Sequence, residues 1–294
     1  MKLGLQYQRD DGGSKAFARR AEMMAFDSVW CGDHVGHLYD GIATLGCYAG
    51  ATESIDIGVN MLVAPYRPAA VMAKALATIA NIAPGRVVAG FGVGGEFPGE
   101  FVATGANLRT RGASTDEALE AIRLLWQGEP VTYHGRYVTL DNFQLEPAPA
   151  PPPAIWIGGR SEAALRRAVR FGDAYSPYLV SPGQLAKRRA RLEVLAQESG
   201  RSLDGFTIAC LVTVVPAPTM EAGVQRGLDA LALSGMTPES VRAHYLLGND
   251  DDLQERVAEY ASAGVDHLIL GCLPGTDADL EEFFDKAAVI RAGL

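Results

Sequence analysis

The chain has 294 residues, of which 48% are hydrophobic, and carries a formal net charge of -9. This length can bury a large core, either as one barrel or as two smaller domains. The negative charge argues against a general affinity for nucleic acid or anionic lipid, because such a surface would be repelled. A charged fraction of 21% is typical of a folded enzyme and excludes a disordered or fibrous chain.

The apolar segments and the cysteines predict a cytoplasmic protein. Met1–Tyr7 has too few apolar residues for the core of a signal peptide and already resembles a strand. The apolar stretch Val71–Ile82 is interrupted by Lys74 and is too short and too charged to span a bilayer. We expect buried, reduced thiols at the cysteines, which have no CxxC spacing: Cys31, Cys47, Cys210 and Cys272.

Short apolar runs alternate along the chain with longer segments of helical periodicity, which predicts βαβ units and a parallel sheet. The predicted strands are Lys2–Tyr7, Ser28–Cys31, Asp56–Leu62, Arg86–Gly92, Ala154–Gly158, Ala174–Tyr178, Thr207–Val215 and His267–Gly271. The predicted helices are Ser14–Met24, Pro68–Ile82, Ala113–Trp126, Ser161–Phe171, Pro182–Ser199, Met220–Leu233, Leu253–Ala263 and Asp277–Arg291. Eight strands predict an α/β fold, a single-domain (β/α)8 TIM barrel over residues 1–294.

Two segments interrupt this alternation. Residues 128–153 contain a hairpin pattern at Val131–Leu145 and the proline-rich Pro147–Pro153, which could also be a linker between domains. We interpret them as an insertion in one barrel, because the alternation resumes at once with Ala154. Residues 234–252, rich in Gly, Asn and Asp, are predicted to form a long surface loop near the barrel mouth.

Polar residues that follow the second and third strands are candidates for chemistry, because the carboxyl ends of barrel strands form the working face. Asp33 and His34 directly follow the second strand. His34 could exchange a proton with a cofactor ring or substrate, and Asp33 could orient the imidazole or cap the next turn. A capping Asp beside a structural His is the alternative. Asn60 and Met61 end the third strand, which alone indicates only a strand that enters a loop.

The glycines after the fourth strand match the spacing GxGxxG over Gly90–Gly95. We reject a Rossmann dinucleotide loop, because the motif follows the fourth strand and Glu96–Gly99 does not open a helix. We interpret Gly92, Val93 and Gly94 as a strand end that can approach a flat ring system closely.

A second glycine pair, Gly158 and Gly159, leads with Arg160 and Ser161 into a predicted helix. Backbone N–H groups at a helix start attract phosphate, and Arg160 adds positive charge. A glycine turn with Ser161 as the N-cap is the alternative. Tyr178, with Ser176 at the end of the sixth strand, could supply a hydroxyl next to this loop.

The remaining charged residues and histidines have structural interpretations. Arg111, Asp116 and Glu117 surround the start of a long helix and are predicted to form salt bridges and caps. We expect no bound metal, because the other histidines lack metal-ligand spacing: His37, His134, His244 and His267.

In their order and spacing, these motifs resemble the bacterial luciferase-like monooxygenase superfamily of flavin- and F420-dependent oxidoreductases. The resemblance extends from the first strand to Ala263–Asp266 and is carried by Trp30–His34, Pro84–Val87, Gly92–Gly94, Arg111, Asp116–Leu119, Leu125–Trp126, Gly135–Tyr137, Pro152–Gly159 and Arg170–Asp173. It implies a TIM barrel, usually a homodimer, that binds reduced FMN or the deazaflavin F420 and acts on a small organic substrate. The pattern is nearer the F420-dependent branch.

The resemblance also implies roles for particular residues. His34 would contact the redox ring or relay a proton. Asn60 and Met61 would be joined by a non-prolyl cis bond whose bulge supports the ring from behind. Gly158 and Gly159 would form the phosphate loop, with the hydroxyl of Tyr178 nearby.

The sequence departs from the pattern of F420-dependent glucose-6-phosphate dehydrogenases. Leu38 stands where those enzymes have a tryptophan, and their acidic catalytic residue is replaced by Gly95 or shifted to Glu96. A sugar-phosphate dehydrogenase is therefore disfavoured. Arg67 and Pro68 are adjacent, whereas many relatives have one more residue between them, which puts the contacts of the following helix in doubt.

These observations favour hydride transfer between F420 and a small organic substrate. An FMN-dependent monooxygenase that uses reduced flavin and oxygen is the alternative. A barrel that binds a flavin without catalysis is a third hypothesis. A flavin-free lyase would need a lysine or a carboxylate pair at the strand ends, and the predicted strand ends carry no lysine.

Overall fold

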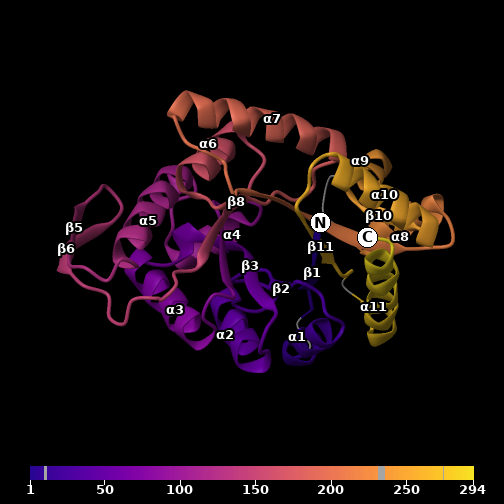
Figure 1. Cartoon of the computed structure of the whole chain (residues 1–294), viewed down its shortest axis with the longest axis horizontal. Coiled ribbons are helices and arrows are strands. Elements are labelled where there is room, and N and C mark those ends of the chain that lie inside the picture. The colour runs from indigo at the N-terminus through magenta and orange to yellow at the C-terminus, as the bar shows by residue number, and fades with distance from the viewer. Residues whose placement is uncertain (10–11, 231–235, 274) are drawn as a thin grey trace.

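Eight parallel strands close into a barrel in the computed structural model, which describes residues 1–9, 12–230, 236–273 and 275–294. The strands are β1 (Lys2–Tyr7), β2 (Ser28–Cys31), β3 (Asp56–Val63), β4 (Val87–Gly92), β7 (Ala154–Ile157), β8 (Ala174–Tyr175), β9 (Thr207–Pro216) and β11 (His267–Gly271). Each pairs in parallel with the next in this order, and β11 pairs with β1 to close the ring (Figure 1). The predicted TIM barrel is confirmed.

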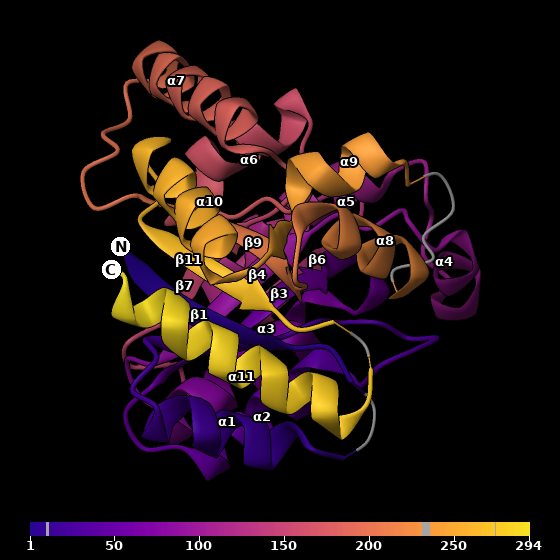
Figure 2. The same cartoon turned by 90° about the vertical axis from the view of Figure 1, so that its right-hand side faces the viewer.

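Helices between the strands cover the outside of the barrel. They are α1 (Ser14–Met23), α2 (Gly41–Ala51), α3 (Ala69–Ile82), α5 (Arg111–Leu125), α6 (Glu162–Phe171), α7 (Pro182–Ser199), α8 (Met220–Ala230), α10 (Asp250–Ser262) and α11 (Asp277–Ala292). Alternate residues of β1, such as Leu3 and Leu5, face outward into the core shared with these helices. The termini lie close together beside α11 (Figure 2). The predicted helix Met220–Leu233 is described only as far as Ala230, and its last residues lie outside the described ranges.

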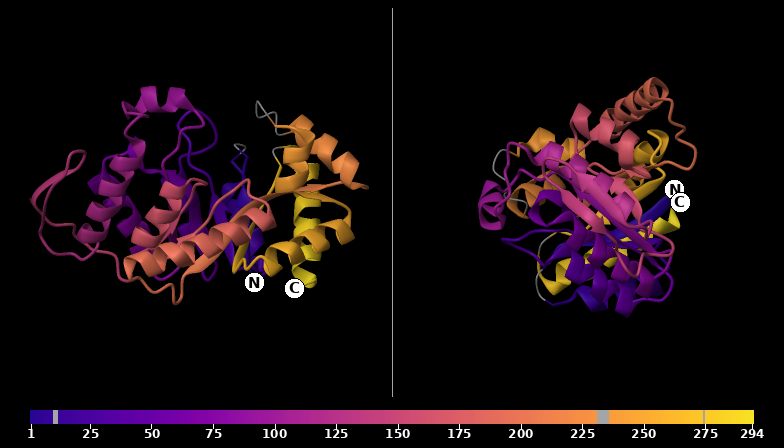
Figure 3. Two further views of the ribbon diagram at one scale, coloured as in Figure 1. Left: turned by 90° about the horizontal axis from the view of Figure 1, so that it is seen from above. Right: turned by 90° about the vertical axis from the view of Figure 1, so that its left-hand side faces the viewer.

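The insertion predicted within residues 128–153 forms an antiparallel hairpin of β5 (Val131–His134) and β6 (Thr139–Phe143). It stands beyond α5 at one end of the molecule (Figure 3). Glu117 of α5 holds its turn by accepting the N–H groups of Arg136, Tyr137 and Val138 at 3.1, 2.7 and 3.1 Å.

The salt bridge predicted near the start of α5 is confirmed, since Asp116 pairs with Arg167 of α6 at 2.6 Å. Arg111 instead donates to the carbonyl of Leu108 at 2.8 Å. Neither residue caps α5, whose N-cap position, Thr110, makes no side-chain cap hydrogen bond.

Three short elements correct the sequence predictions. The segment 234–252 was expected to be a loop, yet its described part contains α9 (Pro238–His244) and β10 (Leu246–Gly248), which pairs with β9. Residues 234 and 235 lie outside the described ranges. The signal for α9 was present, because Thr237 accepts the N–H of Ser240 as N-cap and Pro238 follows it. Residues after Glu96 were expected to open no helix, but α4 (Pro98–Thr104) begins at the proline.

Helix α2 was also not predicted. Its sequence, GIATLGCYAGA, contains three glycines and has no polar stripe of helical period. Asp40 starts the helix by accepting the N–H of Ala43 at 2.8 Å. Burial between neighbouring elements outweighs its low helix propensity.

The amino end of the barrel interior is filled by aromatic rings. Trp30 of β2 and Trp156 of β7 lie with ring centroids 4.7 Å apart, and His267 of β11 packs edge-on against both. A Cβ on Gly58 would lie 2.2 Å from the Trp30 ring, so only glycine fits there. This end of the interior is therefore packed core, which limits a ligand to the carboxyl end.

Two further expectations concern the thiols and the membrane. Cys31, Cys210 and Cys272 are buried, but Cys47 on α2 is exposed, so the prediction of burial is wrong for Cys47. Among the described residues, the helices include none with the length and apolar character that a membrane crossing requires.

Candidate active site at the carboxyl end of the barrel

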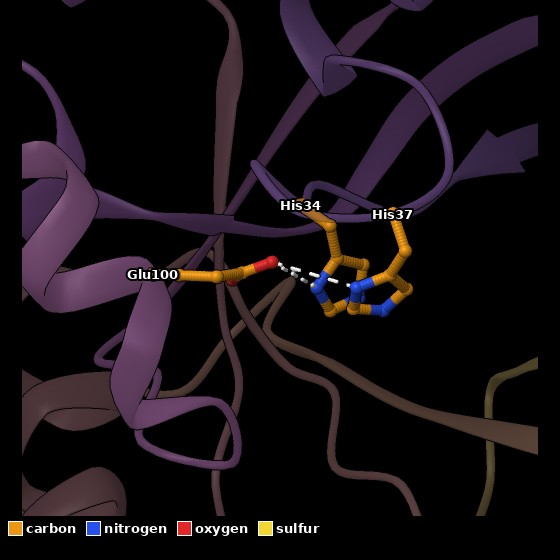
Figure 4. Close-up of side chains that lie close together, drawn as sticks. All are labelled: His34, His37 and Glu100. Carbon is orange, nitrogen blue, oxygen red and sulfur yellow. Dashed lines mark ion pairs between the residues drawn. The ribbon is translucent and has the colours of Figure 1, made fainter.

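His34 lies in a cluster with His37 and Glu100 at the carboxyl end of the barrel (Figure 4). The two histidines follow β2, and Glu100 comes from α4. The imidazole rings stack with centroids 3.8 Å apart and planes inclined by 30°. Their Nδ1 atoms lie 3.6 Å (His34) and 3.5 Å (His37) from Oε1 of Glu100. The sequence analysis did not anticipate this grouping, because Glu100 is distant in sequence and α4 was not predicted.

Glu100 is a buried carboxylate with well-defined donors. Its Oε1 accepts the N–H groups of Gly36 and Val35 at 2.9 and 3.1 Å, and its Oε2 accepts the hydroxyl of Tyr66 at 3.1 Å. Burial opposes ionisation of Glu100, but these donors and nearby His34 outweigh it and hold the pKa of the carboxyl below its usual value. A negative charge therefore faces the two imidazoles at neutral pH.

The environment of His34 favours a neutral ring. Burial lowers the pKa of His34 and the neighbouring His37 lowers it further, whereas Glu100 acts in the opposite direction. Its Nδ1 is buried and has no hydrogen-bond partner in the described part of the chain, since 3.6 Å to Glu100 is too long for one. The ring is thus available for proton exchange or for another ligand.

Asp33 does not orient the imidazole of His34, contrary to one of the two roles considered for it. The guanidinium of Arg67 donates to both of its carboxylate oxygens at 2.7 Å. The N–H groups of Gly41, at the start of α2, and Val63 also donate, at 3.0 and 3.1 Å. Asp33 therefore ties the loop after β2 to the ends of β3 and α2.

Asn60 and Met61 are joined by a cis peptide bond, as the resemblance implied. The register between β3 and β4 shifts at this point, between Val59 and Leu62. The bulge places Asn60 in the barrel interior, where Oδ1 lies 3.5 Å from the hydroxyl of Ser176, at hydrogen-bond distance.

The side chain of Met61 lies against two glycines of β4 and the glycine that follows β7. A Cβ on Gly90 would be 2.7 Å from its Sδ, one on Gly92 3.2 Å from its Cβ, and one on Gly158 2.7 Å from its Cγ. The sequence offered other reasons: the approach of a strand end to a flat ring for Gly92, and a phosphate loop for Gly158. In the structure, the direct effect of these glycines is to make room for Met61.

The residues after β4 form a tight turn. Val93 and Gly94 are half-buried, and Gly94 has a φ of 65°. A Cβ on Gly94 would lie 2.7 Å from Cγ1 of Val63. The turn therefore requires glycine at this position.

In the loop from β7 to α6, Ser161 is the N-cap of α6, and Gly158 has a different role from the predicted phosphate binding. Ser161 accepts the N–H of Ala164 at 3.2 Å as N-cap of α6. The N–H of Gly158 donates to the carbonyl of Phe91 on β4 at 2.9 Å, so it continues the sheet and is not free for a phosphate. Gly159 has a φ of 113°, and its carbonyl accepts the hydroxyl of Tyr175 at 2.8 Å.

Charged side chains surround this loop. The hydroxyl of Tyr178 contacts Oε1 of Glu96, and the Arg160 guanidinium lies 4.0 Å from the same oxygen and 5.3 Å from the Tyr178 ring. Glu96 thus faces Arg160 and Tyr178, whereas the acid beside His34 is Glu100. Arg188 of α7 donates to the carbonyl of Arg160 and adds a second positive charge. Arg188 was not predicted, because the helix phase decides which of several basic residues of α7 faces the loop.

The carboxyl half of the interior is lined by small and polar side chains. Gln6, Ser176 and Thr213 are buried there, on the strand positions that alternate with the outward-facing core. Oε1 of Gln6 has no hydrogen-bond partner among the described residues. Gln6 was missed by the sequence analysis, although its position between outward-facing Leu5 and Tyr7 on β1 was a usable signal.

Comparisons with known proteins agree with this geometry. The sequence profile of the luciferase-like monooxygenase family matches residues 12–236. The chain is 28% identical to an F420-dependent glucose-6-phosphate dehydrogenase of Nakamurella multipartita over 87% of this chain and 85% of that protein. It is 36% identical to an F420-dependent hydroxymycolic acid dehydrogenase of Mycobacterium tuberculosis over 54% of this chain and 47% of that protein.

The fold is similar to that of a solved F420-dependent secondary alcohol dehydrogenase in complex with an F420-acetone adduct. The TM-score is 0.88 at 23% sequence identity, and the match covers 99% of both chains. At this identity the likeness concerns the fold. The family profile covers most of the chain, including the strands that carry His34, Met61 and Gly158. The chain therefore belongs to the luciferase-like monooxygenase family.

Proposed function

We propose that this protein is an F420-dependent oxidoreductase that exchanges a hydride between F420 and a small organic substrate at the carboxyl end of the barrel. The observation that carries the proposal is the convergence of three features on this one end: the His34 and Glu100 pair, the bulge at Met61, and the loop at Gly159. Named F420-dependent relatives that match most of the chain support it.

The residues present fit such a cofactor. The unpartnered Oε1 of Gln6 and the small polar lining suit a polar ring system that enters the interior. The start of α6, with Arg160 and Arg188 beside it, suits the phosphate of the cofactor. Bound F420 supplies the site that accepts or donates the hydride, and the protein supplies position and electrostatics.

The chain's own residues have separate tasks in this proposal. The His34 ring nitrogen that does not face Glu100, Nε2, would hold or take up the substrate proton as the hydride moves. Glu100 places a negative charge 3.6 Å from Nδ1 of the ring, and Asp33 positions the loop that carries the ring through Arg67. Met61 would support the cofactor ring from behind, as the resemblance implies.

The alternative is an FMN-dependent monooxygenase that uses reduced flavin and oxygen, which the description of the family profile favours. Binding of each cofactor to the purified protein separates the two. We expect F420 to bind with about micromolar affinity, seen as quenching of protein fluorescence, and FMN to bind more weakly. Binding of FMN without binding of F420 would contradict the proposal.

Turnover tests the further hypothesis of a flavin-binding protein without catalysis. F420 reduction with a panel of alcohols, and oxidation of reduced F420 with the corresponding aldehydes and ketones, are both followed by the visible absorbance of F420. Both rates should fall by about 100-fold or more in His34→Ala, because general acid–base groups contribute this much. His134→Ala, on the exposed hairpin, is the matched control. Absence of turnover by the wild type with every substrate would favour the non-catalytic hypothesis, whereas full turnover by His34→Ala would contradict the catalytic role proposed for His34.

Two positions in the site bear on the identity of the substrate. Leu38 replaces the tryptophan of sugar-phosphate dehydrogenases, which still disfavours glucose 6-phosphate. The apparent lack of the acidic catalytic residue was the other reason against glucose 6-phosphate. It no longer holds, because an acid, Glu100, lies beside His34. We propose a small neutral organic substrate, and glucose 6-phosphate belongs in the panel as the competing case.

We also propose that the protein is a cytoplasmic homodimer, on the resemblance to its family. Sedimentation at several protein concentrations tests the assembly. Fractionation of the source cells tests the location.

A further inference from the structure

The sequence led us to expect no bound metal, but on the geometry we propose that His34, His37 and Glu100 form a binding site for a divalent transition cation such as Zn²⁺. Each of the three residues offers one ligand atom, and these atoms all lie within 4.8 Å of one another (Figure 4). Tetrahedral zinc with bonds of about 2.0–2.1 Å requires ligand atoms about 3.3 Å apart. The distances from Oε1 of Glu100 to the two Nδ1 atoms, 3.5 and 3.6 Å, are close to this separation of ligand atoms.

Both imidazoles turn Nδ1 toward the same oxygen of Glu100. Nδ1 of His34 is buried, points at the carboxylate and makes no hydrogen bond within the described residues. His37 stacks on His34 with its own Nδ1 directed at the same oxygen. Two imidazoles at this separation cannot both be protonated without repulsion. A single cation between the nitrogens and the carboxylate satisfies all three groups.

The ligands are also held in place before any metal binds. The N–H groups of Val35 and Gly36 and the hydroxyl of Tyr66 fix the carboxylate of Glu100. Such supporting contacts orient metal ligands. The ring of Phe97 packs against both imidazoles, with centroids 5.3 Å from His34 and 4.5 Å from His37.

The ligand set limits the cation and its affinity. Imidazole and carboxylate together suit zinc, cobalt, nickel and iron, whereas magnesium and calcium prefer oxygen alone. Three protein ligands leave a fourth position for water or substrate. Because Oε1 of Glu100 also accepts two backbone N–H groups, we expect weaker binding than at a closed four-ligand zinc site.

Metal binding would have a functional consequence, which rests on the proposed role of His34. A cation that takes the lone pair of Nδ1 fixes the His34 ring and leaves the ring proton on Nε2, so that Nε2 can no longer accept a proton. We therefore expect Zn²⁺ to inhibit F420-dependent turnover reversibly. The site would make the enzyme sensitive to free transition metal.

Cobalt provides a direct test that needs no F420. The purified protein, with any affinity tag removed, is titrated with Co²⁺ while the visible d–d absorption is recorded, and Zn²⁺ is then added as competitor. We expect one site per chain, displacement by Zn²⁺ and no competition from Mg²⁺. Absence of a protein-bound Co²⁺ spectrum in the wild type would overturn the proposal, whatever the outcome of the cofactor experiments.

Variants assign the site to these residues. His37→Gln, at a side chain that is 40% exposed, should weaken Co²⁺ binding by about 100-fold or more, beyond the effect of losing a supporting contact. Glu100→Gln keeps the shape of the side chain and should also weaken binding. His134→Gln, on the hairpin, should bind as the wild type does. Equal Co²⁺ binding by His37→Gln and the wild type would overturn the assignment of the metal site to these residues. Zn²⁺ inhibition that persists unchanged in His37→Gln would overturn the proposal that Zn²⁺ inhibits turnover through this site.

Discussion

The two ends of the barrel interior are built from the same strands but serve opposite purposes. At the amino end, Trp30 and Trp156 fill the space, and polar atoms have partners: Nε1 of Trp30 donates to Oγ of Ser28 at 2.6 Å, and Ser28 lies 2.7 Å from Nε2 of His267. At the carboxyl end, the lining is small or polar, and Oε1 of Gln6 lacks a partner among the described residues. The buried polar atoms named at the amino end are thus satisfied by the protein itself, whereas Oε1 of Gln6 at the carboxyl end is not satisfied by the described residues.

This contrast indicates where stability and binding reside. Buried polar atoms without partners are costly in a protein interior, so they persist where a ligand satisfies them. Substitutions at the amino end should therefore reduce stability. Substitutions at the carboxyl end should mainly change binding, apart from those that break the support of a loop.

The largest effect is expected at the amino end. Trp156→Ala removes a 6% exposed indole that packs against Trp30 and should lower the free energy of unfolding by about 3–5 kcal/mol through the cavity it leaves. Urea unfolding followed by circular dichroism measures it. Ser176→Ala at the other end, which removes one long hydrogen bond, should cost about 1 kcal/mol or less. Equal losses in the two variants would remove the distinction between the ends.

Asp33 lies at the carboxyl end, but its substitution is expected to reduce stability. Asp33→Asn removes the charge that faces Arg67 and leaves a guanidinium whose side chain is only 17% exposed without its main partner. The loss should be about 3 kcal/mol of unfolding free energy, because a broken buried ion pair leaves one charge uncompensated. Asp40, the other partner of Arg67, is about half exposed, and Asp40→Asn should cost about 1 kcal/mol or less. A small effect of Asp33→Asn would restore it as a candidate for direct catalysis.

His267 gives the amino end a pH dependence. Burial lowers the pKa of His267 to about 4, with Lys2 contributing in the same direction. In the unfolded chain the pKa is about 6.5, so below that pH the unfolded state binds a proton that the folded state does not. Stability should therefore fall with decreasing pH from about 6.5 toward 4, by about 2 kcal/mol between pH 7 and pH 5.

Urea unfolding at the two pH values tests this for the wild type and for His267→Gln. The variant should lose most of this part of the pH dependence. Should it keep the wild-type slope, another group carries the effect. A proton NMR titration of His267 in the folded protein would then report its pKa directly.

The barrel itself was predictable, because its signals are local. The alternation of apolar runs with helical periodicity placed all eight barrel strands close to their observed bounds. Helices with weak local signals were missed. Helix α2 is rich in glycine and is held by its packing, and α4 and α9 are short and start with proline.

In the candidate site, too, features with local sequence signals were predicted and features that depend on tertiary contacts were not. Strand-end positions pointed to His34, Met61 and Gly158, because the fold places all such residues at one end. The partners of these residues depend on tertiary structure. No sequence spacing shows that Glu100 reaches His34 or that Asp33 is taken by Arg67, since each contact joins loops of different strands.

The smallest effect is expected where the carboxyl end is shaped by absent side chains. Gly158→Ala would place a Cβ 2.7 Å from Cγ of Met61, whose side chain also lies against Gly90 and Gly92. Met61 must then move into the interior, where the cofactor ring is proposed to lie. We expect F420 affinity to fall by about tenfold, which corresponds to about 1.4 kcal/mol, with a smaller change in unfolding free energy than in Trp156→Ala.

The double variant Gly158→Ala with Met61→Ala tests whether the effect passes through Met61. If it does, Gly158→Ala should have little further effect on F420 binding once Met61 is shortened, and the two substitutions will not be additive. Gly46→Ala is the matched control, since its Cβ would meet only Ile79 of α3, at 4.0 Å, where α2 packs against α3. It should leave binding unchanged and stabilise the helix by about 0.5–1 kcal/mol. Additive losses would mean that Gly158 acts on the cofactor directly, as the sequence first indicated.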